Sequence, residues 1–438
     1  MNALLTDLYQ LTMAAGYWSA GKAEETATFE LFVRRLPANR NYLIAAGLEQ
    51  AVDYLLHLRF EEDEIRYLQG LPQFRRAEPG FFEALRRFRF TGDLFAVPEG
   101  TPVFAGEPLL TVRAPLMEAQ IPETFLLSMV GFQTMVATKA ARMVDAGGGR
   151  SVVEFGTRRA HSPQAGLYAA RAAFVGGCAG TSNVLAGMRF GIPVFGTAAH
   201  SWVQSFPTER EAFERLQALL GEGTTYLIDT YDTLEGARQA VALGKPFWGV
   251  RLDSGNLIEL SRAVRRILDE GGCREAKIMA TGDLNEYKIL ELVAAGAPID
   301  AFGVGTELAT SMDAPSHGAV YKMVEHVSPQ GRRYTAKFSA DKATLPGAKQ
   351  VFRFRDRDMI GRAHECPSPD AEALLRPVIL RGELVAPLPS AAEARERGRQ
   401  SIEALPKKLR TLFEVDPPYR IDLSEELIQL AGEVRARR

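Results

Sequence analysis

The sequence is poor in cysteine and histidine, and it contains no long apolar run. Its 438 residues include only three cysteines, Cys178, Cys273 and Cys366, which lie far apart and form no Cys-x-x-Cys pair. A disulfide framework and a structural zinc site are therefore not expected, and we expect a reducing, cytoplasmic location. The first residues carry no basic stretch, and no segment reaches about 18 uninterrupted apolar residues, so neither a signal peptide nor a membrane span is expected.

A strong charge of one sign is also absent. The formal net charge is −2, with 52 basic and 54 acidic residues. A chain so nearly neutral has no broad attraction for nucleic acid or for an anionic membrane, so any basic site must be local. Apolar residues make up 46% of the chain and charged residues 24%, which is typical of a globular enzyme.

The length favours two or three domains, and the patterning divides the chain at about residues 120 and 330. In the first domain, 1–120, the residues 26–33 predict a strand, whereas 43–58 and 80–88 predict helices. Glycine and proline then punctuate short β-forming runs, which predicts hairpins. A long amphipathic helix over 123–145 follows and ends at a run of three glycines.

The second domain, 121–330, alternates short apolar runs with helical patterns. This βαβα order predicts a parallel sheet with right-handed crossovers. The predicted strands are 151–155, 177–181, 193–197, 225–229, 247–252, 277–281 and 301–304, with 319–325 as a candidate eighth. Seven or eight parallel strands favour an irregular (β/α) barrel, and an open doubly wound sheet is the alternative.

The third segment, 331–438, is at first basic and turn-rich and then helical. Lys337, Lys342 and Lys349 lie in its basic tract. The tract is either a solvated loop, the usual outcome for a run of charge, or a clamp on a polyanion. Two charged stretches, 391–399 and 424–437, predict helices near the end of the chain.

One of only six histidines, His200, follows a predicted strand in the sequence Gly196-Thr197-Ala198-Ala199-His200-Ser201-Trp202. The carboxyl end of a strand is where an α/β barrel places its chemistry. His200 is therefore either a satisfied loop histidine or a nucleophile, base or phosphate carrier.

Each of the other predicted strands also ends in polar or glycine residues. A single such end is explained by helix capping, because Asp, Ser, Thr and Asn are the favoured N-caps. Arginines, a histidine and several aspartates converging on one face instead favour an active site. The ends are Glu154–Arg159, Gly180–Asn183, Asp229–Asp232, Arg251–Asn256, Thr281–Asp283 and Gly303–Glu307.

The last two of these ends suggest a phosphate ligand. Glycines let backbone N–H groups approach a phosphate closely, and the last strands of a barrel often hold one. No Walker A pattern and no GxGxxG fingerprint is present, so a P-loop or dinucleotide site is not supported. Phe155 and Arg158 offer an aromatic face and a guanidinium for a planar anion, although a core phenylalanine and a surface arginine would explain them equally well.

These motifs together resemble the nicotinate phosphoribosyltransferase family. The resemblance runs from Leu5–Met13 through the strand ends around Phe155, His200, Asp253 and Gly282 to Phe302–Thr306, in the family's order. It implies a type II phosphoribosyltransferase fold, in which an N-terminal α/β domain is completed by the C-terminal segment and packs on an irregular barrel. It also implies a homodimer whose active sites borrow residues from the partner, plausibly Tyr9.

The implied reaction forms nicotinate mononucleotide and pyrophosphate from nicotinate and phosphoribosyl pyrophosphate. This is the first step of NAD synthesis from nicotinate (salvage), a glycosyltransferase-type reaction of the ligase class. The family couples it to ATP hydrolysis by phosphorylating the histidine that matches His200. A phosphohistidine would add charge that orders the site, and its hydrolysis would favour synthesis.

The resemblance also assigns roles to residues. It implies that Asp229 and Asp253 contact the ribose and Mg²⁺. It also implies that the pyridine ring lies between Phe155 and Tyr9, with Arg158 near its carboxylate or near the phosphates. The remaining expected substrate contacts are Thr157, Ser182, Ser201, Arg251, Gly282, Gly303, Gly305 and Thr306.

Ser182 bears on the choice of base. Related nicotinamide-using enzymes carry an aspartate at the matching position, which repels a carboxylate, whereas a serine hydroxyl donates to one. The alternatives left open are a nicotinamide phosphoribosyltransferase, a quinolinate phosphoribosyltransferase, and a barrel that binds ligands without catalysis.

Overall fold

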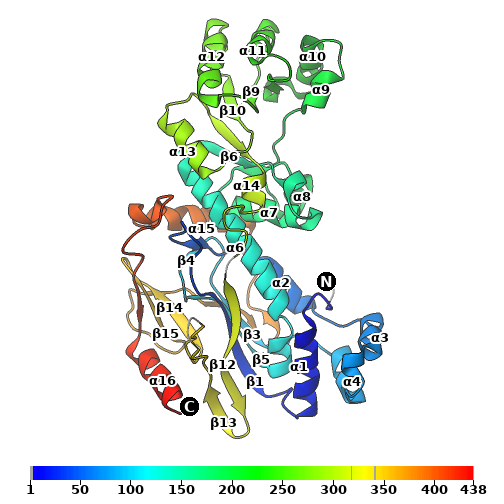
Figure 1. The fold of residues 1–438 in the computed structure, drawn as a ribbon, viewed down its shortest axis with the longest axis vertical. Coiled ribbons are helices and arrows are strands. Elements are labelled where there is room, and N and C mark those ends of the chain that lie inside the picture. Colours follow the sequence, from blue (N-terminus) through cyan, green and yellow to red (C-terminus); the bar gives the residue numbers. More distant parts are fainter. Residues whose placement is uncertain (1–2, 317, 340–341, 438) are drawn as a thin grey trace. The chain divides into compact units, whose positions relative to one another are not determined.

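The structure is a computed structural model that describes residues 3–316, 318–339 and 342–437. The chain folds into two compact units (Figure 1). Unit 1 comprises residues 1–134, 316–389 and 401–438, and unit 2 comprises 135–315 and 390–400. No helix within the described ranges is long and apolar enough to cross a membrane.

Unit 1 is built on an antiparallel sheet to which the chain returns after unit 2. The strand order is β13-β12-β1-β5-β3-β17-β18, so strands from both halves of the sequence alternate in one sheet. Its strands are β1 (Thr26–Val33), β3 (Asp93–Ala96), β5 (Pro108–Pro115), β12 (Ala319–Ser328), β13 (Gly331–Tyr334), β17 (Arg376–Leu380) and β18 (Glu383–Leu384).

A smaller four-stranded sheet, a two-stranded ribbon and several helices complete unit 1. The small sheet has the order β16-β14-β15-β19. These strands are β14 (Lys349–Arg353), β15 (Asp358–Arg362), β16 (Glu372–Ala373) and β19 (Ile421–Leu423), and the ribbon is β2 (Leu43–Ile44) with β4 (Pro102–Val103). The helices are α1 (Leu8–Ser19), α2 (Leu48–His57), α3 (Glu62–Gly70), α4 (Pro79–Arg86), α5 (Leu116–Gln120) and α16 (Glu425–Ala436), while α6 (Glu123–Ala146) belongs to both units.

Unit 2 contains the parallel sheet. Its order is β7-β6-β11-β10-β9-β8. The strands are β6 (Ser151–Glu154), β7 (Gly180–Thr181), β8 (Thr225–Leu227), β9 (Gly249–Leu252), β10 (Lys277–Ala280) and β11 (Ala301–Val304). Most strand residues here are buried, as expected for strands covered by helices on their faces.

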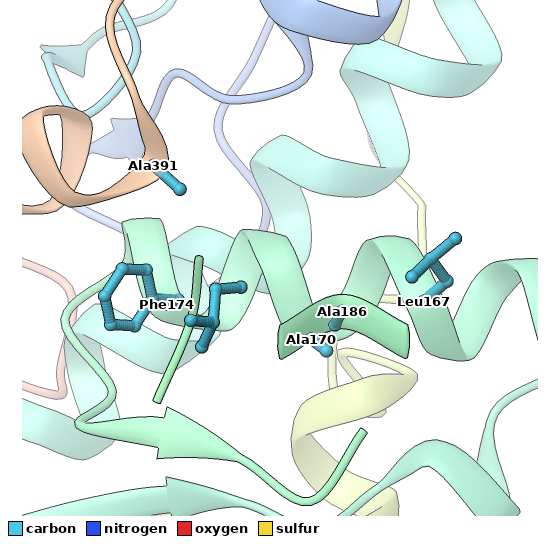
Figure 2. Packing of buried hydrophobic residues seen from close by; sticks show 6 residues of the cluster. Leu167, Ala170, Phe174, Ala186 and Ala391 are labelled. Carbon is cyan, nitrogen blue, oxygen red and sulfur yellow. The ribbon is translucent and has the colours of Figure 1, made fainter. Parts of the chain in front are cut away.

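Helices follow the strands of unit 2 in the predicted alternation. They are α7 (Pro163–Val175), α8 (Val184–Phe190), α9 (His200–Gln204), α10 (Glu209–Leu220), α11 (Thr233–Ala242), α12 (Leu257–Glu270), α13 (Glu286–Ala294) and α14 (Thr306–Ala309). The start of α15 (Ala391–Ala404) also packs here: Ala391 joins a core of α7 and α8 residues that includes Phe174 (Figure 2). Arg395 donates to the carbonyls of Cys178, at 3.0 Å, and Gly177, at 3.2 Å.

The α/β class and the parallel sheet are confirmed, whereas the barrel of seven or eight strands is not. Among the described residues, the ladder holds six strands, and the predicted strand 193–197 contributes one bridge, Val194 to Thr181. Pro193 lacks an N–H, which limits pairing there. The segment 319–325 is a strand, but its assignment to the parallel sheet is wrong. It forms part of β12 and pairs antiparallel with β1 in unit 1.

One predicted helix also needs trimming. The predicted helix over 43–58 begins only at Leu48, because Leu43 and Ile44 pair with β4 and Gly47 precedes the helix with φ +96°. The predicted helices over 80–88 and 123–145 correspond to α4 and α6. The predicted boundaries of the three domains stay predictions.

Candidate active site

A cavity of about 590 Å³ lies in unit 2 at the carboxyl ends of the parallel strands. Its walls come from loops that follow β6, β7, β9, β10 and β11, and from the segment before α9. The lining residues are Phe155, Thr157, Arg158, Arg159, Ser182, Gly196, Thr197, Ala198, Ala199, His200, Leu227, Arg251, Asp253, Thr281, Gly282, Asp283, Gly303, Gly305 and Thr306. Eleven of the fourteen predicted site residues are thus together in one cavity.

Some polar residues after the strands cap the next helix, and others do not. Asn183, Asp232, Asn256 and Asn285 each accept a hydrogen bond from the backbone N–H three residues later and cap the helix that follows. His200, Arg158, Arg251 and Asp253 cap no helix in this way. The capping explanation therefore accounts for part of the polar set and leaves the cavity residues for chemistry.

Arg251 and Asp253 form the fixed charge pair of the cavity. An Arg251 Nη2 donates to Asp253 Oδ1 at 2.6 Å, and Arg251 Nε donates to Thr281 Oγ1 at 2.9 Å. The Thr281 hydroxyl also donates to the Asp253 carboxylate. Burial alone would raise the pKa of Asp253, but the hydrogen bonds from Thr281 and Arg251, with the charges of Arg251 and His200, outweigh it and lower that pKa. Asp253 is therefore an anion at neutral pH.

His200 lies next to this anion. Its Nε2 is 3.8 Å from Asp253 Oδ2, and its Nδ1 is 3.1 Å from Thr230 Oγ1. His200 is the first residue of α9, and its side chain is 42% exposed. The histidine is therefore accessible from the cavity while both ring nitrogens face polar groups.

Asp229 lies beside the cavity rather than on its wall. Its Oδ2 accepts from the backbone N–H of Asp253 at 3.0 Å and from the Ser254 hydroxyl at 2.8 Å. Its Oδ1 is buried and accepts no hydrogen bond from the described residues. Ser201 is exposed in the first turn of α9 and does not line the cavity.

The glycines at the ends of β10 and β11 allow a close backbone approach. Gly282 has φ +94°, and a Cβ there would lie 2.2 Å from the carbonyl oxygen of Asp253. A Cβ on Gly303 would lie 2.6 Å from Thr281 and 2.7 Å from the Phe155 ring. Both positions therefore require glycine.

Phe155 and Arg158 follow β6, and the Phe155 ring lies against Gly303 of the neighbouring strand β11. The Phe155 N–H donates to the Val304 carbonyl at 2.7 Å, so the residue is fixed between β6 and β11. Thr157 accepts from the Asn183 side chain at 3.1 Å, which links this loop to the one that carries Ser182. Arg158 is exposed, and Ser182 is half-buried.

Two sets of predicted residues belong to unit 1. Tyr9, in α1, is 47% exposed, and burial, with the charges of Glu123 and Asp7, raises its pKa to about 12. Lys349 is buried and bonds Glu30 at 2.7 Å, so it is unavailable as a clamp on a polyanion. Lys337 and Lys342 are exposed, and positions 340–341 of that tract lie outside the described residues.

The sequence analysis missed several cavity residues. Arg159, Thr197 and Asp283 lie within the motifs that it quoted but received no role, and Thr230 was passed over although it bonds His200. The only sequence signal that could have identified them was their position in the same loops after the strands. Polar residues are common in such loops, so their position there could not have singled these four out.

Comparison with known proteins agrees with this geometry. The N-terminal, central and C-terminal domain descriptions of nicotinate phosphoribosyltransferase match residues 4–131, 150–329 and 339–431. The chain belongs to the nicotinate phosphoribosyltransferase family. The central family match contains the whole cavity.

Curated members of the family are similar to this chain over most of their length. A nicotinate phosphoribosyltransferase of Mycobacterium tuberculosis is 44% identical over 99% of this chain and 94% of its own. The enzyme of Bacillus subtilis is 46% identical over 80% of this chain and 73% of its own. That of Homo sapiens is 33% identical over 99% of this chain and 96% of its own.

Solved structures extend the comparison to the fold. Human nicotinic acid phosphoribosyltransferase superposes with a TM-score of 0.85 at 30% identity, covering 98% of this chain and 99% of that one. A nicotinate-nucleotide pyrophosphorylase from Pyrococcus furiosus gives a TM-score of 0.73 at 26% identity, covering 92% and 95%.

Proposed function

We propose that the chain forms nicotinate mononucleotide and pyrophosphate from nicotinate and phosphoribosyl pyrophosphate, the first step of NAD synthesis from nicotinate. The observation that carries the proposal is a single cavity that joins three subsites. An aromatic ring and a guanidinium lie beside the glycines, and the Arg251–Asp253 pair lies near His200. The first subsite suits a planar anion, the glycines suit a phosphate, and the charged pair suits a ribose.

The ring subsite is Phe155, Arg158 and Ser182. An aromatic face stacks on a pyridine, and a guanidinium is the preferred partner of a carboxylate. A serine hydroxyl donates to a carboxylate without repelling it. Nicotinate therefore fits this wall better than nicotinamide.

The phosphate subsite is the pair of glycine loops. Gly282 and Gly303 line the cavity without a side chain, so a ligand can approach their backbone closely, and Thr306 begins the short helix α14 beside Gly305. Backbone donors of this kind suit a 5′-phosphate.

The transfer breaks the bond between ribose C1 and the pyrophosphate oxygen and forms the bond from C1 to the pyridine nitrogen. Positive charge develops on the ribose as the pyrophosphate leaves. Asp253, held ionised by Arg251 and Thr281, is a fixed anion next to that charge. Such a preorganised charge stabilises the transition state without reorganisation.

Mg²⁺ would be held by Asp229 and Asp253 together with pyrophosphate oxygens. The unpaired buried Oδ1 of Asp229 fits this assignment. In the part of the chain that the structure describes, no group of three His, Cys, Asp or Glu residues forms a metal cage. This agrees with an ion that is shared with the substrate, since Mg²⁺ usually binds one or two carboxylates plus phosphates and would here neutralise the leaving group.

ATP coupling is assigned to His200. With its Nε2 toward Asp253, the lone pair of Nδ1 would attack the terminal phosphorus of ATP, forming an N–P bond and releasing ADP. The hydroxyl of Thr230 would turn away from Nδ1 in that step. Hydrolysis of the phosphohistidine would then return the neutral ring and release phosphate.

We also infer a curled sheet and a homodimer. Residues from both edge strands, Ser182 after β7 and Leu227 in β8, line the same cavity, as the wall of an irregular barrel requires. Exposed apolar side chains lie on α1 and just before it in unit 1, and on α8 and the segment after it in unit 2, and such surfaces usually mark contacts with another chain. They are Leu5, Leu8, Tyr9 and Met13, and Val184, Leu185, Met188, Val194 and Phe195. Tyr9 would enter the partner's site.

The test is a product assay with nicotinate, phosphoribosyl pyrophosphate and Mg²⁺, with and without ATP, on the wild type and His200→Ala. We expect mononucleotide formation that ATP stimulates in the wild type and not in the variant. Product without an ATP effect would remove the phosphohistidine from the proposal. Turnover of nicotinamide or quinolinate in preference to nicotinate would replace the substrate, and no turnover of any base would favour a non-catalytic binding protein.

A further inference from the structure

A buried lysine in unit 2 contacts three carboxylates behind the cavity. Lys139, in the part of α6 that belongs to unit 2, is 1% exposed. Its Nζ lies 2.7 Å from Glu286 Oε2, 3.3 Å from Glu307 Oε2 and 2.8 Å from Asp313 Oδ1. None of these four residues lines the cavity.

Two of these carboxylates follow the glycine loops directly. Glu286 is the first residue of α13, four residues after Gly282. Glu307 is the second residue of α14, two residues after Gly305. One ammonium group therefore joins the first turns of the two helices whose preceding loops form the proposed phosphate subsite.

The charges explain why this link is strong. Glu286 is fully buried and is also bonded by Arg142 Nε at 3.0 Å. Without Lys139, the carboxylates of Glu286 and Glu307 would face each other in a medium of low dielectric, where like charges repel strongly. The repulsion would act between the two loops and would move them apart.

We propose that Lys139 is a positioning residue that sets the spacing of the two phosphate-binding loops and thereby the affinity for the phosphate-bearing substrate. The inference rests on the proposed function, because it takes phosphoribosyl pyrophosphate as the ligand of those loops. Lys139 acts through Glu286 and Glu307 and does not touch the substrate.

The test separates the two substrates. In Lys139→Met we expect KM for phosphoribosyl pyrophosphate to rise roughly tenfold or more, since an ångström of misplacement can cost about a hundredfold. KM for nicotinate should change less, because Arg158 and Ser182, which would bind its carboxylate, lie in the segments after β6 and β7 and outside the two glycine loops. Calorimetric binding of phosphoribosyl pyrophosphate alone should show the same loss.

A second variant covers the case in which Lys139→Met does not fold. Glu307→Gln leaves the pair of Lys139 with Glu286 intact and weakens only the tie to α14, and the Glu307 side chain is 22% exposed. We expect a smaller rise of a few fold in the same KM. The double variant Lys139→Met/Glu307→Gln should bind the substrate better than Lys139→Met, because the repulsion is removed.

The matched control is Arg353→Met, which removes a cation from a mostly buried ion pair in unit 1. It should leave both KM values unchanged. Equal rises of both KM values in Lys139→Met, or no change in either, would overturn the inference while wild-type turnover keeps the proposed function. A wild type that forms no mononucleotide would instead refute the proposed function itself.

Discussion

Two arginine–aspartate pairs of this chain have the same bond length and opposite surroundings. Arg251 and Asp253 in unit 2 are joined at 2.6 Å, and so are Arg353 and Asp358 in unit 1. The Asp253 side chain is 29% exposed toward the cavity, whereas that of Asp358 is fully buried.

The difference shows that the surroundings of an arginine–aspartate pair decide whether the pair stabilises the fold or meets a substrate. Asp358 also accepts from the Tyr419 hydroxyl at 3.1 Å, and Phe104 stacks on Tyr419, so protein surrounds the carboxylate of this pair. Such a pair orders two strands and the C-terminal segment. The open pair can instead meet a substrate, and fixed charge in a cavity is what transition-state stabilisation needs.

The largest expected effects come from removing the two arginines. Arg251→Met should lower kcat/KM for mononucleotide formation by about 10²- to 10³-fold, because Asp253 loses its main partner. Its unfolding free energy should change little, since the site is partly solvated. Steady-state kinetics and urea unfolding of the purified protein measure the two effects.

Arg353→Met provides the opposite half of the comparison. Leaving Asp358 buried without its cation should cost about 3 kcal/mol or more of unfolding free energy. The specific activity of the folded protein should stay close to that of the wild type. A large loss of activity in this variant at full folding would break the comparison.

A smaller effect is expected at Gly282. In Gly282→Ala the added Cβ would meet the Asp253 carbonyl oxygen, and φ +94° suits glycine, so the loop must shift. We expect KM for phosphoribosyl pyrophosphate to rise about tenfold and KM for nicotinate to change less. Gly296→Ala, at φ +62° on the surface of the same unit, is the control for a strained backbone away from the cavity.

The closed network should also give a pH dependence of stability. Burial, and then repulsion by Asp358, raises the pKa of Glu107 well above its ordinary value. The folded state therefore holds this proton to higher pH than the unfolded chain. The stabilisation is complete below the unfolded pKa and is lost as pH rises through the folded pKa.

Glu107→Gln removes that titration. Its unfolding free energy should become larger relative to that of the wild type as pH rises, by at most about 1.4 kcal/mol per pH unit, because only the wild type loses this stabilisation. Urea unfolding of both proteins between pH 5 and pH 8 measures the difference. Parallel curves would show that Glu107 does not titrate in this way.

The smallest effect concerns the base. Ser182→Asp places an anion on the ring subsite, which should repel nicotinate and accept a bond from an amide. We expect the preference for nicotinate over nicotinamide in kcat/KM to fall by about tenfold. Ser182→Asn, which adds no charge, separates repulsion from size, and an unchanged preference in Ser182→Asp would exclude the role of this residue.

Much of unit 2 could be predicted from the sequence because its signals are local. Short apolar runs such as 277–281 and 301–304 are buried strands in the structure, and the polar residues after them line one cavity. Parallel strands covered on both faces give this pattern without knowledge of their partners.

What could not be predicted depends on contacts between distant residues. The run 319–325 has strand character, but its antiparallel pairing with β1, almost 300 residues earlier, is invisible in local pattern. Lys139 and Glu307 are likewise joined across 168 positions of the sequence. The charge of Lys349 suggested a polyanion clamp, and only the structure shows that Glu30 neutralises it.

The most direct test compares Asp253→Asn with Asp358→Asn, because asparagine keeps the shape of each side chain, removes its charge and replaces one acceptor oxygen by an NH2 group. Both proteins would be assayed for mononucleotide formation and for unfolding free energy under the same conditions. The account predicts that Asp253→Asn loses about a thousandfold in kcat and keeps its stability, whereas Asp358→Asn loses stability and keeps its specific activity. An Asp253→Asn protein that turns over at the wild-type rate would contradict it.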